Sequence, residues 1–537
     1  MTTVVIGDRL TPEDVARVAR DDAPVEISGG ARERVRASRE RVASVIDSDQ
    51  AVYGINTGFG ELVSKRIPRG QLDQLQTNLV RSHASGAGAE LDREVVRAML
   101  LTRLQALSLG YSGVREILAD HLATMLNEGV HPVVRSIGSL GASGDLAPLA
   151  HLALVLIGEG EAFVDGVDGR LDGDEALAEA GLEPLALAPK EGLALINGTQ
   201  LTVGLAALAV VDAERLLDAA DAAGALTTEV GMGTTVTSNE AIAGVRPHPG
   251  HAASAANVRR LTADSEIVES HRNCDRVQDP YSLRCLPQVH GAVREAVAHL
   301  REGVETELNS ATDNPLIFPA ADVDPRTSQT ERAAVVSGGN FHGAPLAHRL
   351  EYAADALTDL AAISERRVDL LLNPNRQEPH LPPFLTDESG LESGLMIAQY
   401  TAAALLNECR ATGNAAVDNT PVSGGQEDHV SMSATSAGAL REIVDRVRRV
   451  LAIELLAGCE AAEYVDDDLA HGRGTAAVYE TVRDLVPPVV DDRPLHRDVD
   501  AIAATVADGL LLDRVGDAMG EAFASIEDGR STSRTRS

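Results

Sequence analysis

The sequence predicts a mainly helical, all-α protein with a central bundle of long helices and a small mixed part at its N-terminus. Apolar residues recur at spacings of three and four over long stretches, which places them on one face of a helix. Aromatic residues make up only 2% of the chain and tryptophan is absent, so aliphatic side chains must fill the core. Such side chains pack well between closely spaced helices. Strand signals are few and short.

The N-terminal part, residues 1–200, is predicted to be a domain that mixes short strands with helices. Strands are expected at Thr3–Ile6, Val25–Ile27 and Ala162–Val164. The dipeptide Asp165-Gly166 follows the third strand and is a turn signal, so a small hairpin is expected there. A long helical pattern covers residues 92–127 of the same part.

The second part, residues 201–528, is predicted to form the helix bundle. Its helical patterns cover 201–223, 286–308, 346–363, 392–414 and 434–463. Glycine-rich polar stretches predict loops at 53–60, 84–88, 136–146, 229–250, 311–342 and 419–428. The last segment, 529–537, reads GRSTSRTRS and is expected to be disordered.

The charge of the chain is strongly negative. Asp plus Glu number 81 and Lys plus Arg 47, which gives a formal net charge of −34. This field repels nucleic acid and anionic membranes, so neither is an expected partner. Lys65 and Lys190 are the only lysines. An acidic protein with few lysines is expected to work in concentrated salt, where screening suppresses self-repulsion. The alternative is an acidic protein adapted to ordinary salt, which leaves the lysine depletion unexplained.

The remaining composition predicts a cytoplasmic protein without a metal site. The four cysteines, Cys274, Cys285, Cys409 and Cys459, form no CxxC pair and are expected to be reduced thiols. The first twenty residues lack the basic and apolar segments of a signal peptide. No apolar run approaches the length of a membrane span. Neither a metal-ligand spacing nor a phosphate-binding loop is present.

One short motif carries unusual chemistry. Residues 138–151 read GSLGASGDLAPLAH. Because Gly144 has no side chain, its nitrogen can fold back onto the carbonyl carbon of Ala142. Ring closure with loss of water gives an imidazolone, and loss of the Ser143 hydroxyl as a second water leaves an electron-poor methylene. The alternative is a turn of small residues with Asp145 as a helix N-cap, which is the favoured interpretation of an isolated Ala-Ser-Gly.

The string ASGDLAPLAH resembles the signature of the aromatic amino-acid ammonia-lyase family. Members of that family build 4-methylidene-imidazol-5-one autocatalytically from Ala-Ser-Gly, here Ala142-Ser143-Gly144, and need no external cofactor. Further strings occur in family order over about residues 50 to 435. They are YGINTGFG (53–60), RSHASGAG (81–88), LALINGTQ (193–200), RVQDPYSLRCLPQVHG (276–291), SGGNFHG (337–343) and QEDHVSM (426–432). The resemblance implies a fumarase/aspartase-like helical architecture and a homotetramer whose active sites take residues from three subunits.

Two positions indicate the branch of the family. At the substrate-selecting position this chain has Ser82-His83, where tyrosine-type members carry His-Leu and phenylalanine-type members Phe-Leu. The string QEDHVSM resembles the histidine branch, in which its glutamate, here Glu427, faces an imidazole. His83 and Glu427 can supply a hydrogen-bond partner at each end of that ring.

The activity that this branch implies is non-oxidative deamination of L-histidine to trans-urocanate and ammonia, the first step of histidine degradation. Two alternatives remain open at this point. One is a tyrosine ammonia-lyase or aminomutase of the same family, and the other is a family member without activity. Whether the substrate's amine or its ring attacks the methylene is also open.

The resemblance assigns roles to three residues at the substrate's reacting end. Tyr53 is expected to be the base that removes the β proton, although a loop-anchoring tyrosine is the simpler interpretation of the residue alone. Arg284 is expected to clamp the substrate carboxylate with two parallel hydrogen bonds. Tyr281 is expected to orient the electrophile, and in a helix it would share a face with Arg284.

The remaining site residues are also assigned by the resemblance. Asn197 is expected to hydrogen-bond the imidazolone oxygen or the substrate, with a turn asparagine as the alternative. Gln278 is expected to assist at the substrate's polar end, and Phe341 to pack beside the imidazolone. Glu427 is expected to bind or deprotonate the imidazole, while its alternative is to cap a helix starting near Val430.

Overall fold

The computed structural model describes residues 2–47, 67–272, 276–327, 330–417, 420–466 and 468–529. The chain divides into two compact units, each made of three segments. The N-terminal unit comprises Met1–Val211, Arg301–Glu351 and Asn414–Gly438, and the bundle unit comprises Asp212–Leu300, Tyr352–Gly413 and Ala439–Ser537. These units differ from the contiguous domains expected from the sequence, because four long helices contribute residues to both.

The N-terminal unit contains short strands, as predicted. Among the described residues the strands form four small sheets. They are β1 (Val4–Ile6) with β2 (Val25–Ile27), β3 (Ala87–Glu90) with β5 (Arg135–Ile137), β4 (Val130–Pro132) with β6 (Glu161–Val164) and β7 (Leu171–Asp172), and β8 (Leu316–Pro319) with β9 (Ala333–Val336). The hairpin expected after Val164 is confirmed, since β6 and β7 pair antiparallel with Ala162 opposite Leu171.

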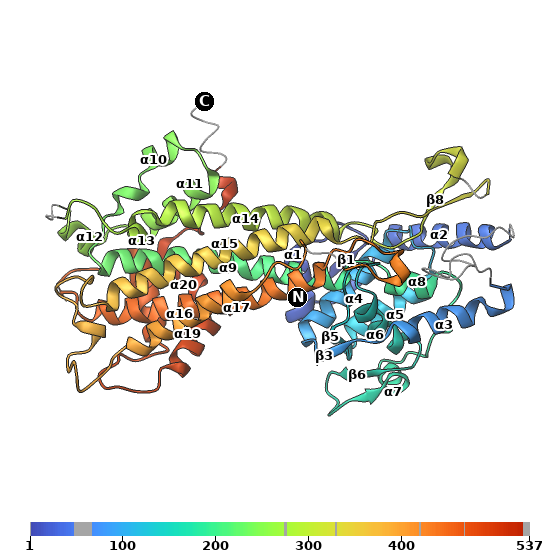
Figure 1. Cartoon of the computed structure of the whole chain (residues 1–537), viewed down its shortest axis with the longest axis horizontal. Coiled ribbons are helices and arrows are strands. Elements are labelled where there is room, and N and C mark those ends of the chain that lie inside the picture. Colours follow the sequence, from blue (N-terminus) through green and yellow to red (C-terminus); the bar gives the residue numbers. More distant parts are fainter. Residues whose placement is uncertain are drawn as a thin grey trace. The chain divides into compact units, whose positions relative to one another are not determined.

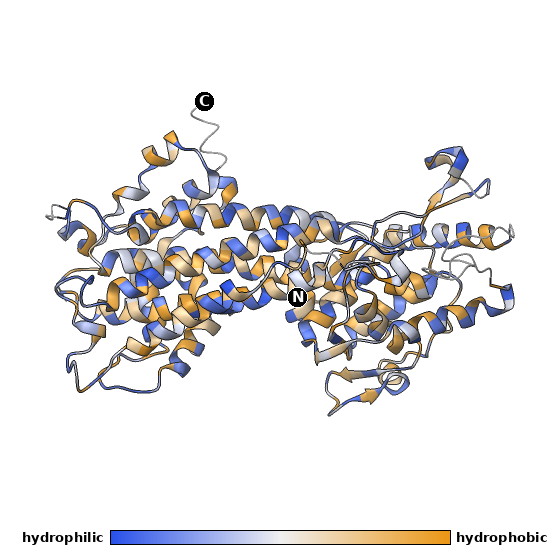
Figure 2. Ribbon diagram, viewed as in Figure 1, coloured by the Kyte–Doolittle hydropathy of each residue, from blue (hydrophilic) through white to orange (hydrophobic). Residues whose placement is uncertain are grey.

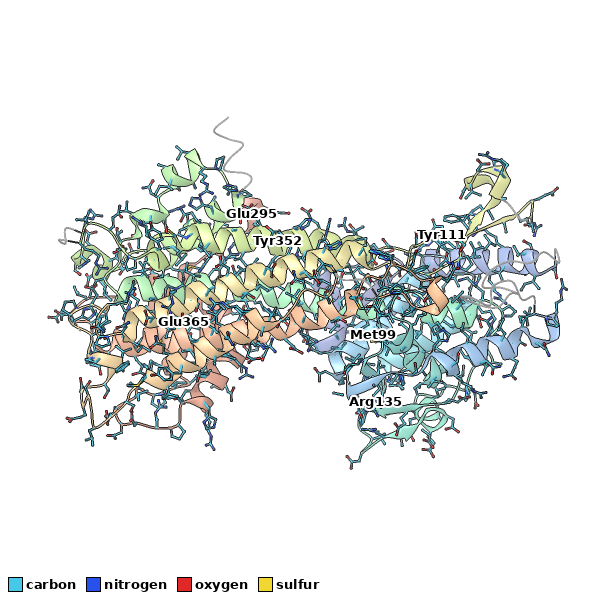
Figure 3. The ribbon with its side chains drawn as sticks, viewed as in Figure 1. Met99, Tyr111, Arg135, Glu295, Tyr352 and Glu365 are labelled. Carbon is cyan, nitrogen blue, oxygen red and sulfur yellow. The ribbon has the colours of Figure 1, made fainter. Side chains whose placement is uncertain are left out.

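The hairpin β8–β9 corrects one prediction. Residues 311–342 are expected to be a loop, but Leu316–Pro319 and Ala333–Val336 pair antiparallel within them. Ile317, Ala333 and Val335 bury their side chains against Val42 and Val45 of helix α2 (Gly29–Asp47). The neighbouring ring of Phe318 lies 5.3 Å from that of Tyr111, which Figure 3 labels. These strands are too short to be predicted from the sequence pattern, and packing against α2 stabilises them.

Helix α4 runs through the centre of the N-terminal unit. The sequence predicts one helical stretch over 92–127, but the structure has two helices there, α4 (Arg93–Ser108) and α5 (Glu116–Asn127). The break lies at Gly110 and Gly113, whose φ angles of +83° and +72° favour glycine. Every residue of α4 from Val95 to Ser108 is buried, including Met99, which is labelled in Figure 3.

The other helices of the N-terminal unit are shorter. They are α1 (Pro12–Arg20), α3 (Leu72–His83), α6 (Leu146–Leu156), α7 (Gly173–Glu179) and α8 (Glu191–Ile196). The chain leaves α8 at Asn197 and begins the long helix α9 three residues later.

Long helices dominate the bundle unit, as predicted. They are α9 (Gln200–Val230), α14 (Leu286–Leu308), α15 (Ala344–Leu372), α16 (Met396–Ala411) and α17 (Ser433–Ala462). Helices α9, α14, α15 and α17 run side by side in Figure 1, and Figure 2 shows apolar and polar residues alternating along them. The shorter helices are α10 (Glu240–Val245), α11 (Pro249–Leu261), α12 (Glu266–Ser270), α13 (Tyr281–Arg284), α18 (Arg473–Arg483), α19 (His496–Asp508) and α20 (Leu510–Met519). Among the described residues, no helix has both the length and the apolar character needed to cross a membrane.

A buried polar network crosses the bundle between α9, α15 and α17. The carboxylate of Glu454 accepts hydrogen bonds from Arg367 Nη2 (2.9 Å), Ser364 Oγ (2.6 Å) and Thr227 Oγ1 (3.0 Å). The side chains of Glu454 and Arg367 are fully buried. Bulk solvent therefore does not reach the Arg367 guanidinium to take the place of this carboxylate.

We expect Glu454→Ala to lower the free energy of unfolding by about 3–5 kcal/mol, because it leaves the buried Arg367 charge without its partner. Chemical denaturation at fixed salt concentration measures the change. The matched control is Glu442→Ala on the same helix. Its exposed carboxylate pairs with Arg446 at 2.8 Å, so its loss should cost less than about 1 kcal/mol. Equal effects of the two variants would contradict the structural role of the network.

Candidate active site

The Ala142-Ser143-Gly144 loop lies between β5 and α6, and its backbone is pressed against a second loop. Gly144 has a φ of +77° and forms an isolated bridge with Gly198. A Cβ atom on Gly144 would lie 2.2 Å from the carbonyl oxygen of Gly198. Only glycine fits at this position, for reasons of both conformation and space.

Two hydrogen-bond donors converge on the carbonyl oxygen of Ser143. Asn197 Nδ2 lies 2.9 Å from this oxygen, and the backbone nitrogen of Gly198 lies 3.3 Å from it. In an imidazolone closed between Ala142 and Gly144, the Ser143 oxygen is the ring carbonyl oxygen. Asn197 itself is buried, and its Oδ1 has no hydrogen-bond partner among the described residues. The sequence indicated Asn197 but not the Gly198 N–H, because a backbone donor has no side-chain signature.

Segments far apart in the sequence pack around the same loop. The backbone nitrogen of Met432 donates to the Leu140 carbonyl oxygen at 3.2 Å. A Cβ on Gly141 would lie 2.2 Å from Ser431 Oγ, and one on Gly343 would lie 2.1 Å from Ser433 Oγ. The three motif strings at 138–151, 337–343 and 426–432 therefore meet in one place. Phe341 lies half-buried in the second of them.

Asp145 has a different role from the N-cap that the sequence offers as an alternative. It occupies the N-cap position of α6, but its side chain makes no capping hydrogen bond. Its buried carboxylate instead accepts from Thr202 N (2.8 Å) at the start of α9 and from Ser139 Oγ (2.9 Å). Burial raises the pKa of Asp145, while the hydrogen bonds from Thr202 and Ser139 lower it. Asp145 thus joins α6 to α9 directly behind Gly144.

His83 ends helix α3 in a defined protonation state. Its Nδ1 lies 2.8 Å from the Leu79 carbonyl oxygen, which can only accept, so Nδ1 carries the proton and Nε2 is the acceptor. Burial of the half-buried ring lowers the pKa of His83, and the nearby Glu427 carboxylate partly opposes this shift. The imidazole is therefore neutral at pH 7.

The Glu427 carboxylate lies near enough to His83 to act on the pKa of its ring electrostatically. Glu427 lies in the loop before α17, where its backbone forms a bridge with Val422. Because α17 begins at Ser433, the alternative in which Glu427 caps a helix near Val430 is wrong. The loop that follows His83 packs against the start of the string 138–151, since a Cβ on Gly138 would lie 3.1 Å from the Cα of Gly86.

Tyr281, Arg284 and Gln278 belong to the bundle unit. Helix α13 is a single turn from Tyr281 to Arg284, and the guanidinium carbon of Arg284 lies 4.6 Å from the centre of the Tyr281 ring. The expectation that the two side chains share one face is confirmed. Tyr281 is 71% exposed and Gln278 is also exposed.

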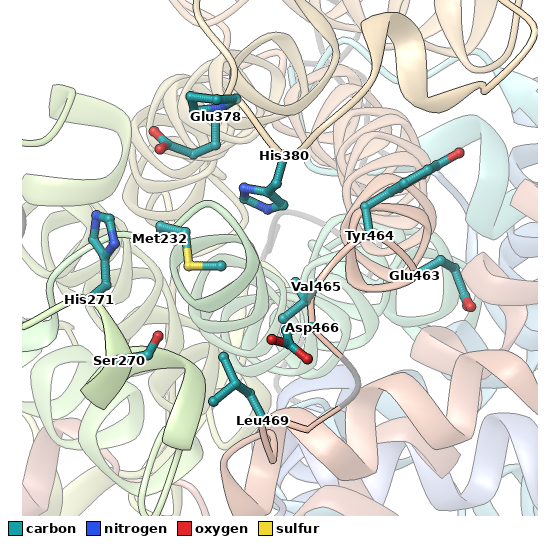
Figure 4. A pocket seen from close by; sticks show the side chains of 11 residues that line it. Met232, Ser270, His271, Glu378, His380, Glu463, Tyr464, Val465, Asp466 and Leu469 are labelled. Atoms are coloured by element: carbon teal, nitrogen blue, oxygen red, sulfur yellow. The ribbon is translucent and has the colours of Figure 1, made fainter.

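The segment before α13 is anchored to the rest of the bundle unit. Asp279 accepts from Thr234 N (2.7 Å) and from Arg276 Nη1 (3.0 Å). Arg276 also pairs with Glu378, which lines a cavity of about 690 Å³. Figure 4 shows Glu378 and His380 on one side of this cavity and Ser270 and Leu469 on the other. These contacts fix the backbone on which Gln278, Tyr281 and Arg284 stand.

Tyr53 lies outside the described residues, as do Gly58 and Gly60 of the same string. Within the described ranges, no group of three or more His, Cys, Asp or Glu side chains is placed to hold a metal ion. Burial raises the pKa of the Cys459 thiol to about 12, which makes it unreactive at neutral pH.

Comparison with known proteins identifies the family. The family model for aromatic amino acid lyases matches residues 10–484. The chain is 61% identical to the "Probable histidine ammonia-lyase" of Halobacterium salinarum, over 97% of this chain and 99% of that one. The solved structure of histidine ammonia-lyase from Trypanosoma cruzi has a TM-score of 0.87 at 38% identity and covers 96% of both chains. That of tyrosine aminomutase from Streptomyces globisporus has a TM-score of 0.90 at 36% identity, over 97% of this chain and 100% of that one. The chain belongs to the aromatic amino acid lyase family.

Proposed function

We propose that this protein is a histidine ammonia-lyase, which converts L-histidine to trans-urocanate and ammonia. The observation that carries the proposal is that Glu427 acts electrostatically on His83, while the loop after His83 packs against the string 138–151. A neutral imidazole acceptor within electrostatic reach of a carboxylate suits a substrate with an imidazole ring. The 61% identity to a probable histidine ammonia-lyase supports the same branch.

The residues of the loop fit the formation of a methylidene-imidazolone. Gly144 lies in the backbone conformation that a side chain would disfavour, and its nitrogen is adjacent to the Ser143 carbonyl that two donors hold. The group would supply an electron-poor methylene, which no ordinary side chain provides. The Asn197 amide and the Gly198 N–H stabilise negative charge on the Ser143 oxygen, as donors fixed before reaction do in an oxyanion hole.

Substrate binding divides between the two ends of histidine. His83 Nε2 accepts a hydrogen bond from the substrate ring, and Glu427 binds or deprotonates the other ring nitrogen. Arg284 binds the carboxylate with its planar fork of donors, with Gln278 assisting there and Tyr281 orienting the electrophile. Phe341 packs beside the imidazolone, and Tyr53 removes the β proton.

We propose that the active form is a homotetramer whose sites combine residues of different subunits. The resemblance of the motif strings to the family carries this proposal, since it implies sites that take residues from three subunits. A monomeric fraction should therefore be inactive. Sedimentation velocity combined with assay of each fraction measures this, and an active monomer would contradict the shared site.

The acidic surface fits a cytoplasm rich in salt, so assays belong in concentrated salt. There, purified protein is mixed separately with L-histidine, L-tyrosine and L-phenylalanine and followed by ultraviolet absorbance. Urocanate should form from L-histidine, while the other two amino acids remain unchanged. Coumarate or cinnamate as the main product would contradict the assignment to the histidine branch. A β-amino acid formed from L-tyrosine would instead indicate an aminomutase. The structural similarity to tyrosine aminomutase is the reason for testing this alternative.

The neutral state of His83 predicts the acid side of the pH profile. Its pKa is lowered from the ordinary value of 6.5, so Nε2 stays an acceptor above that lowered pKa and becomes a donor below it. We expect kcat to be maintained at neutral pH and to fall as the pH drops through the lowered pKa. His83→Gln, whose amide oxygen accepts without titrating, should move or remove this acid limb. An unchanged limb in this variant would rule out His83 as its origin.

A further inference from the structure

Arg103 is a fully buried arginine that has no carboxylate among its hydrogen-bond acceptors in the described part of the chain. It lies on α4, the buried central helix of the N-terminal unit. Its acceptors among the described residues are the carbonyl oxygens of Ala194 (2.8 Å) and Asn197 (3.0 Å) and the side-chain oxygen of Gln200, none of them a carboxylate. Burial lowers the pKa of Arg103 to about 10. Because a buried charge needs hydrogen-bond partners, the position of these acceptors shows what the guanidinium holds.

The acceptors of Arg103 lie where helix α8 stops. In a helix that continued, the Ala194 carbonyl would accept from the backbone N–H of Gly198, four residues later. Here the Gly198 N–H points to the Ser143 oxygen instead, at 3.3 Å. Arg103 Nη1 takes the vacated place at the Ala194 oxygen. The guanidinium therefore donates to carbonyl oxygens at the end of α8 that have no N–H donor within the helix.

The same guanidinium also fixes the residues after Asn197. Its contact with Gln200 Oε1 is extended by Gln200 Nε2, which donates to Thr312 Oγ1 at 2.7 Å. A Cβ on Gly198 would lie 2.6 Å from Gln200 Oε1 and 3.1 Å from Arg103 Nη2, so this network packs directly against the Gly198 backbone. Asn197, whose own carbonyl Arg103 holds, presents its side chain to Ser143 at 2.9 Å.

We infer that Arg103 is a positioning residue, which ends α8 so that Asn197 and Gly198 can both donate to the Ser143 oxygen. This inference rests on the proposed function, because the Ser143 oxygen matters as the imidazolone oxygen. Arg103 touches neither the substrate nor the reacting atoms. Without it, the Ala194 carbonyl is left to compete for the Gly198 N–H, and the donor pair at Ser143 loses its geometry.

The experiment compares Arg103→Met and Arg103→Lys with Arg97→Met, all as purified tetramers in concentrated salt. Arg97 is the control, because it is buried on the same helix and also donates to two backbone carbonyls, of Val18 (2.9 Å) and Leu126 (3.0 Å). Unlike Arg103, it pairs with a carboxylate as well, that of Asp22 at 3.1 Å. Three readouts are taken: the mass of the peptide that contains residues 142–144, the near-ultraviolet absorbance of the imidazolone, and kcat and KM for L-histidine.

We expect Arg103→Met to lower the fraction of chains that have lost two waters and to shift the near-ultraviolet band. Its kcat should fall about 10²-fold, while KM changes less than about 3-fold, because the lost donors act on the transition state. Arg103→Lys, which keeps the charge but not the fork of donors, should lie in between. If Arg103→Met does not form a tetramer, Arg103→Lys decides. Arg97→Met should keep the mass deficit, the band and kcat.

Two results would overturn the inference. The first is full water loss, an unshifted band and a kcat within about 3-fold of wild type in the Arg103 variants. The second is an equal loss of kcat in Arg97→Met, because the effect would then follow from removing any buried arginine of α4. A wild-type protein without the loss of two waters would instead refute the proposed function, whatever the variants do.

Discussion

Replacing Ser143 with alanine should abolish deamination of L-histidine, with kcat falling on the order of 10³-fold or more. The variant lacks the hydroxyl that must leave as water to create the methylene, and no other side chain of the loop can supply that electrophile. The fold should be unaffected, because the contacts that hold the loop are made by the backbone of residues 143 and 144. Urocanate absorbance measures activity, and circular dichroism checks the fold.

The control for this variant is Ser310→Ala. Ser310 follows the end of α14, and its hydroxyl donates to the Thr306 carbonyl at 2.7 Å, so the loss of this hydroxyl should leave kcat unchanged. A Ser143→Ala protein that kept more than about a tenth of the wild-type kcat would exclude the proposed electrophile.

Glu427→Gln should lower kcat for L-histidine by about 10²–10⁴-fold, the range expected when a general base or acid is lost. The amide keeps the shape of the side chain but removes its charge and its ability to take a proton from the ring. Steady-state assay with L-histidine measures the change. Circular dichroism should report an intact fold, because Glu427 pairs with Val422 through its backbone and not through its carboxylate.

The loss should be specific to this carboxylate. Glu128→Gln, an exposed residue that follows α5 in the same unit, removes one negative charge of the same kind and should leave kcat near the wild-type value. A Glu427→Gln protein with wild-type kcat would remove Glu427 from the chemistry. The selectivity for an imidazole substrate would then rest on His83 alone.

The helix bundle is the part of the fold that the sequence predicts best. The period of valines and leucines sets both ends of α14, and the structure has the same bounds, Leu286–Leu308. The hairpin β8–β9 escaped prediction because each strand has four residues. Its stability comes from Val42 and Val45, which are remote in sequence. The break between α4 and α5 depends on glycine conformations, which periodicity alone does not detect.

The candidate site also contains some residues that the sequence predicts and others that only the structure reveals. Motif strings marked Asn197, His83 and Glu427. The structure shows the Asn197 amide on the Ser143 oxygen and Glu427 within electrostatic reach of His83. The Gly198 N–H and Arg103 carried no comparable signal. One is a backbone group, and the other is a single arginine in a helix whose pattern shows only burial. Their roles follow from where α8 stops, which is a property of the folded chain.

The measurement that tests the central claim most directly is the mass of the peptide containing residues 142–144, taken from purified wild-type protein. We expect a mass lower than that of the sequence by two waters, one lost in closing the ring between Ala142 and Gly144 and one from Ser143. In the Ser143→Ala protein, at most the first of these can be missing. A wild-type peptide with the full mass of its sequence would contradict the claim that this chain builds its own electrophile.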